Sequence, residues 1–252
     1  MSGEVVARLR AAGCVFAEDE GAILIEAAAA PAELAVMVER RVSGEPIEQI
    51  VGWAEFCGLR IAIEPGVFVP RRRTEFLVDQ TVALLPPKAV VLDLCCGAGA
   101  IGAALLAQSP NISLHSADVD EVAVACARRN LETPVYEGDL YEPLPLTLKG
   151  NIDVIVANVP YVPSDEIALM PAEAREHEPL TSLDGGPDGL DLLRRVAAGA
   201  PGWLGPGGHL LIETSEWQAA AAVQAFEIHG LRTRVARDDE RGATVVIGTP
   251  HE

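Results

Sequence analysis

The chain has few basic side chains, and this scarcity limits what it can bind. Its 252 residues include 19 lysines and arginines against 37 aspartates and glutamates, which gives a formal net charge of −18. Binding to a nucleic-acid backbone depends on lysine and arginine replacing the counterions around the phosphates. We therefore expect no direct nucleic-acid binding by the surface as a whole, while a local basic patch stays compatible with this charge.

The sequence also lacks the patterns of a metal site, a disulfide framework or a membrane segment. Its five cysteines form no C-x-x-C pair and no Cys/His cluster with metal-ligand spacing. An odd number of cysteines without such a framework is typical of a reducing compartment. No signal-peptide pattern and no membrane-length apolar run is found. We expect a cytoplasmic protein that holds no metal and does not enter a membrane.

What the sequence does contain is a regular alternation of strand-like and helix-like segments from Val90 onward. Short β-branched runs predict strands, and apolar residues at helical spacing predict helices. The expected strands cover residues 90–94, 113–118, 135–136, 153–157, 209–213, 232–236 and 244–248, and the expected helices cover 101–108, 121–130, 191–200 and 218–229. This order predicts an α/β fold with a doubly wound, mostly parallel sheet that binds ligands at the carboxyl ends of its strands.

The first part of the chain has a different pattern. Apolar residues recur at helical spacing over residues 1–45, and Pro31 is placed to begin a second helix. Two short apolar segments follow, 59–63 and 67–69, separated by Pro65-Gly66. Such a pair predicts a β-hairpin. We therefore expect a small helical region and a hairpin ahead of the α/β domain.

A segment of small residues joins the first expected strand of the α/β domain to its helix. It follows Asp93 and comprises Cys95, Cys96, Gly97, Ala98 and Gly99. Small residues let a backbone approach a ligand closely, and a helix N-terminus offers exposed N–H groups. The spacing is not the full G-x-G-x-x-G of dinucleotide binders, and no P-loop lysine is present. A cofactor loop is one interpretation, and a tight turn without a ligand is the alternative.

Two acids lie where a nucleoside could be recognised. Asp118 ends the second expected strand, and a carboxylate there can accept hydrogen bonds from both ribose hydroxyls. Asp139 follows the third expected strand, where it could read an adenine amino group, although a helix cap or solvated loop would explain it as well. With the small-residue loop, these acids outline adenosine recognition without a phosphate clamp. That combination favours S-adenosylmethionine over NAD or ATP.

The segment Asn158-Val159-Pro160-Tyr161 follows the apolar run 152–157. A β-branched run that ends in Asn, Pro and Tyr is typical of a buried strand opening into a functional loop. Such a loop can direct an amide, a backbone carbonyl and an aromatic face at one planar polar group, and the proline stiffens it. Ordinary turn chemistry produces Asn-x-Pro as well, so this segment gains its meaning from the rest of the chain.

These motifs together resemble the HemK family of protein-(glutamine-N5) methyltransferases, which methylate the glutamine of the Gly-Gly-Gln loop in peptide-chain release factors. The resemblance runs from about Arg40 to the C-terminus. It is carried by the segments 41–47, 69–75, 93–101, 158–161, 177–183 and 207–213, together with Asp118. The family fold comprises an N-terminal helical domain, a β-hairpin linker and a Rossmann-like methyltransferase domain with a seven-stranded sheet. The resemblance places these parts at residues 1–48, 49–72 and 73–252.

The resemblance also implies the chemistry and its residues. The Asn158 side-chain oxygen and the Val159 carbonyl would accept the two amide N–H bonds of the glutamine, Pro160 would keep the loop extended, and Tyr161 would cover the amide. S-adenosylmethionine, converted to S-adenosylhomocysteine, would be the methyl donor, and a release factor the protein substrate. The residues expected to bind S-adenosylmethionine are Asp93, Cys95, Cys96, Gly97, Ala98, Gly99, Asp118, Val119, Asp139, Leu140 and Asn158.

Three departures from the family pattern leave the substrate open. Val159 replaces the first proline of Asn-Pro-Pro-Tyr, Cys95 replaces the first glycine of Asp-x-Gly-x-Gly-x-Gly, and Arg71-Arg72-Arg73 stands in the usual Pro-Arg-Pro-x-Thr-Glu. None removes a chemical group that the reaction needs. The alternatives are an N-methyltransferase acting on a small molecule or on adenine in nucleic acid, and a non-catalytic protein that binds S-adenosylmethionine. For His177-Glu178 we expect loop anchoring rather than acid/base catalysis.

Overall fold

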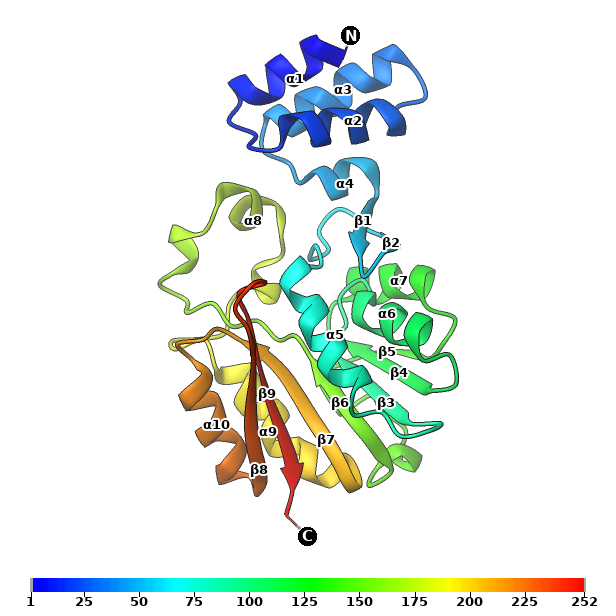
Figure 1. Cartoon of the computed structure of the whole chain (residues 1–252), viewed down its shortest axis with the longest axis vertical. Coiled ribbons are helices and arrows are strands. Elements are labelled where there is room, and N and C mark those ends of the chain that lie inside the picture. Colours follow the sequence, from blue (N-terminus) through cyan, green and yellow to red (C-terminus); the bar gives the residue numbers. More distant parts are fainter. Residues whose placement is uncertain (1, 252) are drawn as a thin grey trace.

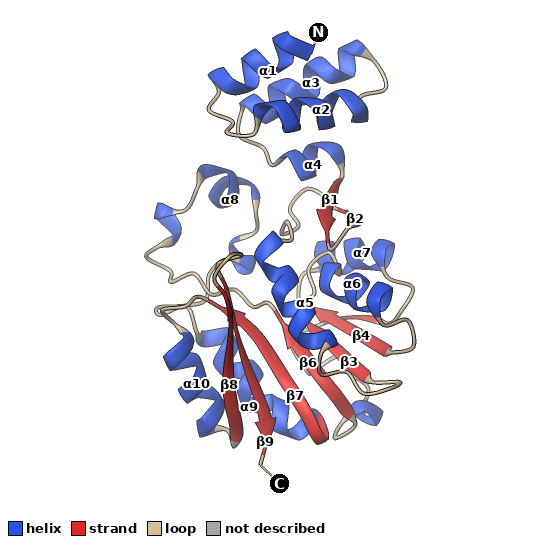
Figure 2. Cartoon of the chain, in the orientation of Figure 1, coloured by secondary structure: helices blue, strands red, loops and turns tan. Residues whose placement is uncertain are grey.

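The computed structural model describes residues 2–251, and its centre is a seven-stranded sheet of order β5-β4-β3-β6-β7-β9-β8 (Figures 1 and 2). The strands are β3 (Val90–Leu94), β4 (Ser113–Asp118), β5 (Val135–Glu137), β6 (Ile152–Ala157), β7 (Leu204–Thr214), β8 (Leu231–Asp238) and β9 (Ala243–Pro250). All neighbours are parallel except β9, which is antiparallel to β7 and β8. The predicted α/β fold class with a mostly parallel sheet is confirmed.

Helices cover both faces of this sheet, which explains why its central strands are almost wholly apolar. One face packs against α5 (Glu75–Val82), α6 (Ala100–Gln108) and α7 (Glu121–Asn130), and the other against α9 (Asp191–Trp203) and α10 (Ala219–Ile228). Side chains of β6 alternate between the two cores, with Val154 and Val156 on one face and Ile155 and Ala157 on the other. None of the helices within residues 2–251 has the length and apolar character needed to cross a membrane.

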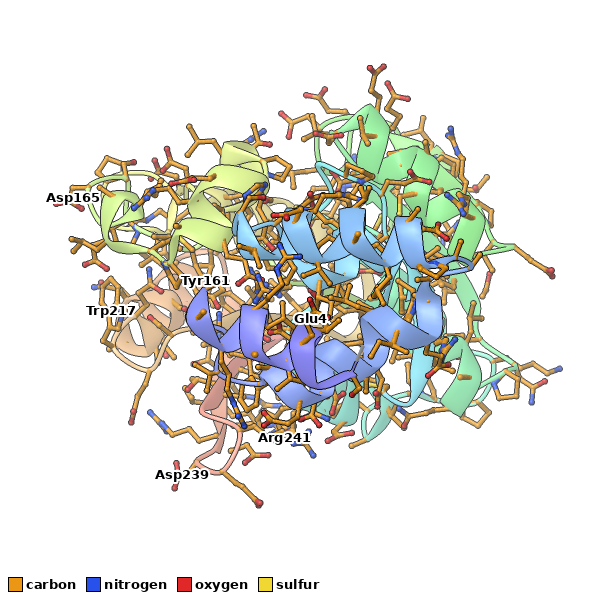
Figure 3. All side chains as sticks on the ribbon, turned by 90° about the horizontal axis from the view of Figure 1, so that it is seen from above. Glu4, Tyr161, Asp165, Trp217, Asp239 and Arg241 are labelled. Carbon is orange, nitrogen blue, oxygen red and sulfur yellow. The ribbon has the colours of Figure 1, made fainter. Side chains whose placement is uncertain are left out.

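The N-terminal region is helical, as predicted, and has a core of its own. It comprises α1 (Ser2–Ala11), α2 (Ala17–Ala27), α3 (Pro31–Val42) and α4 (Ile47–Val51), and Pro31 does begin α3. Leu9, Leu24 and Val38 are buried in this core. Seen from above, these helices lie over the centre of the molecule, with Trp217 and Asp165 at its outer edge (Figure 3).

A β-hairpin follows α4, and one of its two strands lies in the predicted segment 59–63, but its partner strand is not the predicted one. The structure pairs β1 (Trp53–Phe56) with β2 (Leu59–Ala62) around Cys57-Gly58, whereas residues 67–69 belong to no strand. Cys57 and Gly58 have φ of 50° and 73°, the positive values that a tight two-residue hairpin turn requires. The predicted turn at Pro65-Gly66 therefore directs the chain toward the sheet instead of closing the hairpin.

An irregular arch, residues 163–190, connects β6 to α9 and contains α8 (Ala172–His177). Arg41 of α3 reaches it: its Nε donates to Glu20 Oε2 at 2.7 Å, and its Nη2 contacts Glu173 Oε2 at 3.4 Å. Gln49 Nε2 donates to the carbonyls of Val67 and His177, both at 3.3 Å. The N-terminal helices are thus joined to the arch, whose α8 lies beside α4 beyond the end of the sheet (Figure 1).

The buried guanidinium of Arg41 gives a first testable prediction. Arg41→Met removes the only charge that Glu20 pairs with across α2 and α3 within the described residues, and both side chains are about nine-tenths buried. Leaving one member of a buried pair uncompensated costs about 3 kcal/mol, so we expect a loss of that size in the free energy of unfolding, measured by chemical denaturation. Arg8→Met, whose pair with Glu39 is exposed, should cost less than about 1 kcal/mol. Equal losses would contradict this reasoning.

Candidate functional site

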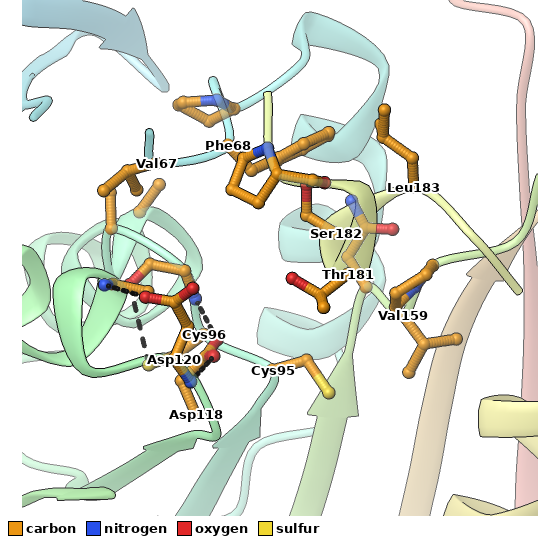
Figure 4. A pocket seen from close by; sticks show the side chains of 18 of the residues that line it. Val67, Phe68, Cys95, Cys96, Asp118, Asp120, Val159, Thr181, Ser182 and Leu183 are labelled. Carbon is orange, nitrogen blue, oxygen red and sulfur yellow. Dashed lines mark hydrogen bonds between the residues drawn. The ribbon is translucent and has the colours of Figure 1, made fainter. Parts of the chain in front are cut away.

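A large cavity lies at the carboxyl ends of β3, β4 and β6. Including its open mouth it measures about 1200 Å³, and it lies where open α/β sheets bind ligands. Its wall is formed by the loop after β3, the end of β4, the loop after β6, residues 66–74 and the arch residues 179–183. In Figure 4, Asp118 and Asp120 lie on one side, Val159 and Leu183 on the other, and Cys95 between them.

Most of the predicted site residues meet in this wall. It contains Cys95, Cys96, Gly97, Ala98, Asp118, Val119, Asn158, Val159, Pro160 and Tyr161. These residues come from three segments of the chain, 95–98, 118–119 and 158–161, of which the first and the last lie more than fifty positions apart in the sequence. Because the parallel register pairs Leu94 with both Ala117 and Ala157, the loops that follow the three strands open on the same edge. The juxtaposition is therefore a direct result of the sheet topology.

The loop after β3 has an unusual backbone conformation. Cys95, Gly97 and Gly99 have φ of 56°, 53° and 77°, a left-handed region that favours glycine. A Cβ at Gly99 would lie 2.8 Å from Leu131 Cδ1, so this position has no room for a side chain. The alternating turns bring the loop backbone to the cavity and then begin α6.

Asp118 holds this loop in place. Its Oδ2 accepts the Gly97 N–H at 2.8 Å, and its Oδ1 accepts the Asp120 N–H at 3.0 Å. Burial raises the pKa of the Asp118 carboxyl, and these hydrogen bonds oppose the rise. The carboxylate therefore organises the loop and at the same time lines the cavity.

Four predicted cofactor residues do not line the cavity wall. Asp93 is fully buried behind the loop, where its Oδ2 accepts the Gly102 N–H at 3.0 Å and burial raises its pKa to about 7. Gly99 turns the chain into α6, and Leu140 is buried in the core on the α9 side. Asp139 forms an ion pair with Arg195 at 2.6 Å. The structure thus gives Asp93 and Gly99 supporting positions behind the wall.

Cys95 offers a test of the loop geometry. Cys95→Gly relieves about 1 kcal/mol of left-handed strain, offset by the greater backbone freedom of glycine when unfolded. We expect the dissociation constant of S-adenosylmethionine, measured by isothermal titration calorimetry, to stay within about threefold of the unmodified protein, since tenfold requires 1.4 kcal/mol. Cys95→Val places a β-branched residue at φ 56° and should lower stability by about 2 kcal/mol. Abolished binding in Cys95→Gly would contradict this loop geometry.

The loop after β6 is fixed from several sides. Asn158 Nδ2 donates to Thr74 Oγ1 at 3.2 Å, and the Val159 side chain is buried in the sheet core at 2% exposure. The Tyr161 carbonyl accepts Gln218 Nε2 at 2.9 Å. Burial, with the neighbouring Glu213 charge, raises the pKa of the Tyr161 phenol to about 12. The loop is therefore rigid, and its tyrosine is neutral.

Three polar residues beside this loop were not predicted as site residues. Glu213 ends the apolar part of β7 and is buried, and its Oε1 accepts Arg73 Nε at 3.3 Å and Tyr161 Oη at 3.5 Å. Arg73 also donates to Tyr161 Oη and lies over the ring at 5.6 Å. The third residue is Thr74. The position of Glu213, an acid at the end of a buried strand, was a signal in the sequence for a site residue. Its partners, Arg73 and Tyr161, lie in distant segments, so the sequence could not predict this cluster.

The expected anchoring role of Glu178 is confirmed. Its Oε1 accepts the Val69 N–H at 3.2 Å, and its Oε2 accepts Arg71 Nη2 at 2.6 Å. Two of the three consecutive arginines are therefore in ion pairs, Arg71 with Glu178 and Arg73 with Glu213. Within residues 2–251, no group of three or more His, Cys, Asp or Glu side chains is placed to hold a metal ion.

Comparison with known proteins gives consistent matches. Residues 58–174 match the family described as methyltransferase small domain. A release factor glutamine methyltransferase of Geobacter sulfurreducens is 37% identical over 86% of this chain and 78% of its own length. A 4-amino-L-phenylalanine/4-methylamino-L-phenylalanine methyltransferase of Streptomyces pristinaespiralis is 34% identical over 77% of this chain and 69% of its own. The fold is similar to that of a methyltransferase from Pyrococcus furiosus, with a TM-score of 0.58 at 18% identity over 83% of this chain and 95% of that one.

Proposed function

This chain belongs to the release factor glutamine methyltransferase family, and on that premise we propose that it methylates the side-chain amide nitrogen of a glutamine in a peptide-chain release factor. It is an enzyme that depends on S-adenosylmethionine. The observation that carries the proposal is that the loop 158–161 and the loop 95–98 line one cavity. A methyl donor and a planar amide acceptor can therefore meet there.

The cavity fits the cofactor through residues already described. Asp118 and Val119 would hold the ribose side, and the backbone of Cys95, Cys96, Gly97 and Ala98 would lie against the cofactor, because left-handed turns at residues 95 and 97 bring that backbone to the cavity. S-adenosylmethionine supplies an electrophilic methyl group on sulfur when bound. The contact predicted for Asp139 stays a prediction, since its carboxylate is paired with Arg195.

The acceptor side would work by positioning rather than by acid/base catalysis. An amide nitrogen is a poor nucleophile because its lone pair is delocalised into the carbonyl. The Asn158 Oδ1 and the Val159 carbonyl would accept its two N–H bonds, hold it in line with the methyl group and stabilise positive charge developing on it. As the N–C bond forms, the S–C bond would break to leave S-adenosylhomocysteine, and the nitrogen would release one of its two protons to water. Pro160 would keep the loop extended, and the Tyr161 ring would pack on the planar amide. Val159 preserves the carbonyl that proline would supply, and its side chain is buried in the sheet core.

We assign substrate recognition to the N-terminal helical region, residues 1–48, with residues 49–72 as the linker to the methyltransferase domain at 73–252. Val15 and Phe16 are exposed at the start of α2, at 83% and 66%, and could contact a protein substrate. A release factor as substrate would place the enzyme in the cytoplasm. Contact with nucleic acid is not required for this activity.

The decisive experiment combines the purified protein with labelled S-adenosylmethionine and a purified release factor, followed by mass spectrometry of the Gly-Gly-Gln peptide. Methylation of that glutamine supports the proposal, and a release factor with this glutamine replaced by alanine is the control. A parallel reaction with 4-amino-L-phenylalanine tests the acceptor named in the Streptomyces relative. Transfer to the amino acid and not to the release factor would overturn the proposed substrate.

A further inference from the structure

The Asn158 side chain can act as an acceptor only in one of its two orientations. The oxygen and nitrogen of an asparagine amide have nearly the same shape, so packing does not distinguish them, and a hydrogen-bond partner must decide. Here that partner is the Thr74 hydroxyl, which accepts Nδ2 at 3.2 Å. With the nitrogen held by Thr74, the oxygen Oδ1 stays available to the cavity that both residues line.

A hydroxyl can also donate, and the surroundings of Thr74 determine which role it takes. Thr74 is 2% exposed, and the nearby charged group is the Glu213 carboxylate. The neighbouring residue Arg73 is already paired with Glu213 Oε1 at 3.3 Å, and Glu213 Oε2 is buried without a partner among the described residues. The free acceptor for the Thr74 proton is therefore this carboxylate, and Thr74 is among the groups that lower the pKa of Glu213 against the rise caused by burial. Since a hydroxyl has one proton, a proton given to Glu213 leaves only lone pairs for Asn158.

The fold places these three residues together. The register of β6 and β7 pairs Ala157 with Ile212, so the next residues, Asn158 and Glu213, lie at neighbouring positions on the sheet edge. Thr74 comes from the start of α5, which packs on that edge. Glu213 Oε2 is buried without a regular hydrogen bond, while Oε1 is already occupied by Arg73 and Tyr161. The Thr74 hydroxyl therefore meets an acceptor with spare capacity.

We propose that Thr74, oriented by the buried carboxylate of Glu213, is a positioning residue that fixes the Asn158 amide with its oxygen toward the methyl acceptor. The proposal rests on the proposed function for its effect on turnover, while the orientation itself is a property of the protein alone. Glu213 serves the loop twice, through Thr74 on Asn158 and directly on the hydroxyl of Tyr161.

The test compares Thr74→Val, which keeps the shape and removes the hydroxyl, with Thr74→Ser, which keeps the hydroxyl. For Thr74→Val we expect kcat with a release factor to fall by about 10- to 100-fold, the upper value being that for losing one preorganised hydrogen bond. Thr74→Ser should stay within about threefold, and the dissociation constant of S-adenosylmethionine within about twofold in both variants. The matched control is Thr81→Val, which removes another buried hydroxyl of α5, bonded only to the Leu77 carbonyl, and should leave kcat unchanged.

A second readout does not depend on the substrate. In the ¹⁵N-labelled full chain, the Asn158 side-chain NH₂ signals are assigned by their loss in Asn158→Ala. In the unmodified protein and in Thr74→Ser, one of these two amide protons should exchange slowly with solvent. In Thr74→Val both protons should exchange rapidly. Glu213→Gln, whose amide can itself donate to Thr74, should broaden the Asn158 NH₂ signals, and it provides the test if Thr74→Val fails to fold.

The outcomes separate the two proposals. Unchanged Asn158 amide signals in Thr74→Val, or equal kcat for Thr74→Val and Thr74→Ser in an active enzyme, would overturn the positioning role. A wild-type protein that methylates no release factor would refute the proposed substrate, and the amide spectrum would still decide whether Thr74 orients Asn158.

Discussion

Replacing Asn158 with alanine is expected to lower kcat for methyl transfer to the release factor glutamine by about 10²-fold or more. The loss has two physical sources. The substrate amide would lose one of its two acceptors, and the acceptor that remains, the Val159 carbonyl, cannot by itself prevent rotation of the amide out of line with the methyl group. Binding of S-adenosylmethionine should change little, because Asp118 and the 95–98 loop remain intact.

The measurement is single-turnover methyl transfer with S-adenosylmethionine and release factor both saturating, so that binding does not limit the rate. Asn151→Ala is the control, because this asparagine is exposed and bonds only to carbonyls of its own loop among the described residues. Asn158→Asp adds a further comparison: the carboxylate has no N–H for Thr74, so it should not restore the rate. An unchanged kcat in Asn158→Ala would remove the loop 158–161 from the mechanism.

Replacing Asp118 with alanine is expected to weaken S-adenosylmethionine binding by about 10²-fold. Hydrogen bonds to a charged group contribute about 1.5–3 kcal/mol each, and Asp118 makes two with the backbone of Gly97 and Asp120. Their loss lets the left-handed turn at Gly97 relax away from the cofactor and also removes the acceptor proposed for the ribose. About 3 kcal/mol of lost interaction corresponds to about 10² in the dissociation constant.

Isothermal titration calorimetry with S-adenosylmethionine measures this loss, and Asp139→Ala provides the comparison. Its carboxylate is half-exposed and paired with Arg195, so removing it should change affinity by less than about threefold, as for other surface ion pairs. A loss in Asp139→Ala as large as in Asp118→Ala would show that Asp139 does contact the cofactor. An Asp118→Ala protein with full affinity would contradict the role given to this loop.

The sequence predicts best where a buried element has a simple period. The continuous apolar runs of β3 and β6 predict strands that are buried on both faces of a parallel sheet. The loops that follow such strands lie at the same edge of the sheet, so their proximity could be predicted as well. The helix α5 went unpredicted, because Glu75–Val82 is short and has buried residues at adjacent positions rather than at one helical spacing. The hairpin was placed too late because Pro65-Gly66 is a stronger turn signal than Cys57-Gly58.

The polar network around Asn158 could not be predicted for a different reason. Thr74, Asn158 and Glu213 are each ordinary residues at the end of a helix or strand, and the hydrogen bond from Asn158 to Thr74 joins residues 84 positions apart in the sequence. Local patterns carry no information on which hydroxyl meets which carboxylate. The same holds for Asp139, since only the packing of α9 brings Arg195 to its carboxylate.

The connection from Arg41 to Glu173, with that from Gln49 to His177, bears on how this protein could be re-engineered. The arch that these contacts support contributes Met170, Pro179 and Thr181 to the cavity wall. The first helices are therefore not an interchangeable cassette that could be exchanged to redirect the enzyme to another target. A chimera with a foreign N-terminal helical region would therefore need a cationic side chain at position 41 and an amide side chain at position 49. Without them the arch would lose its support, and the cavity would lose part of its wall.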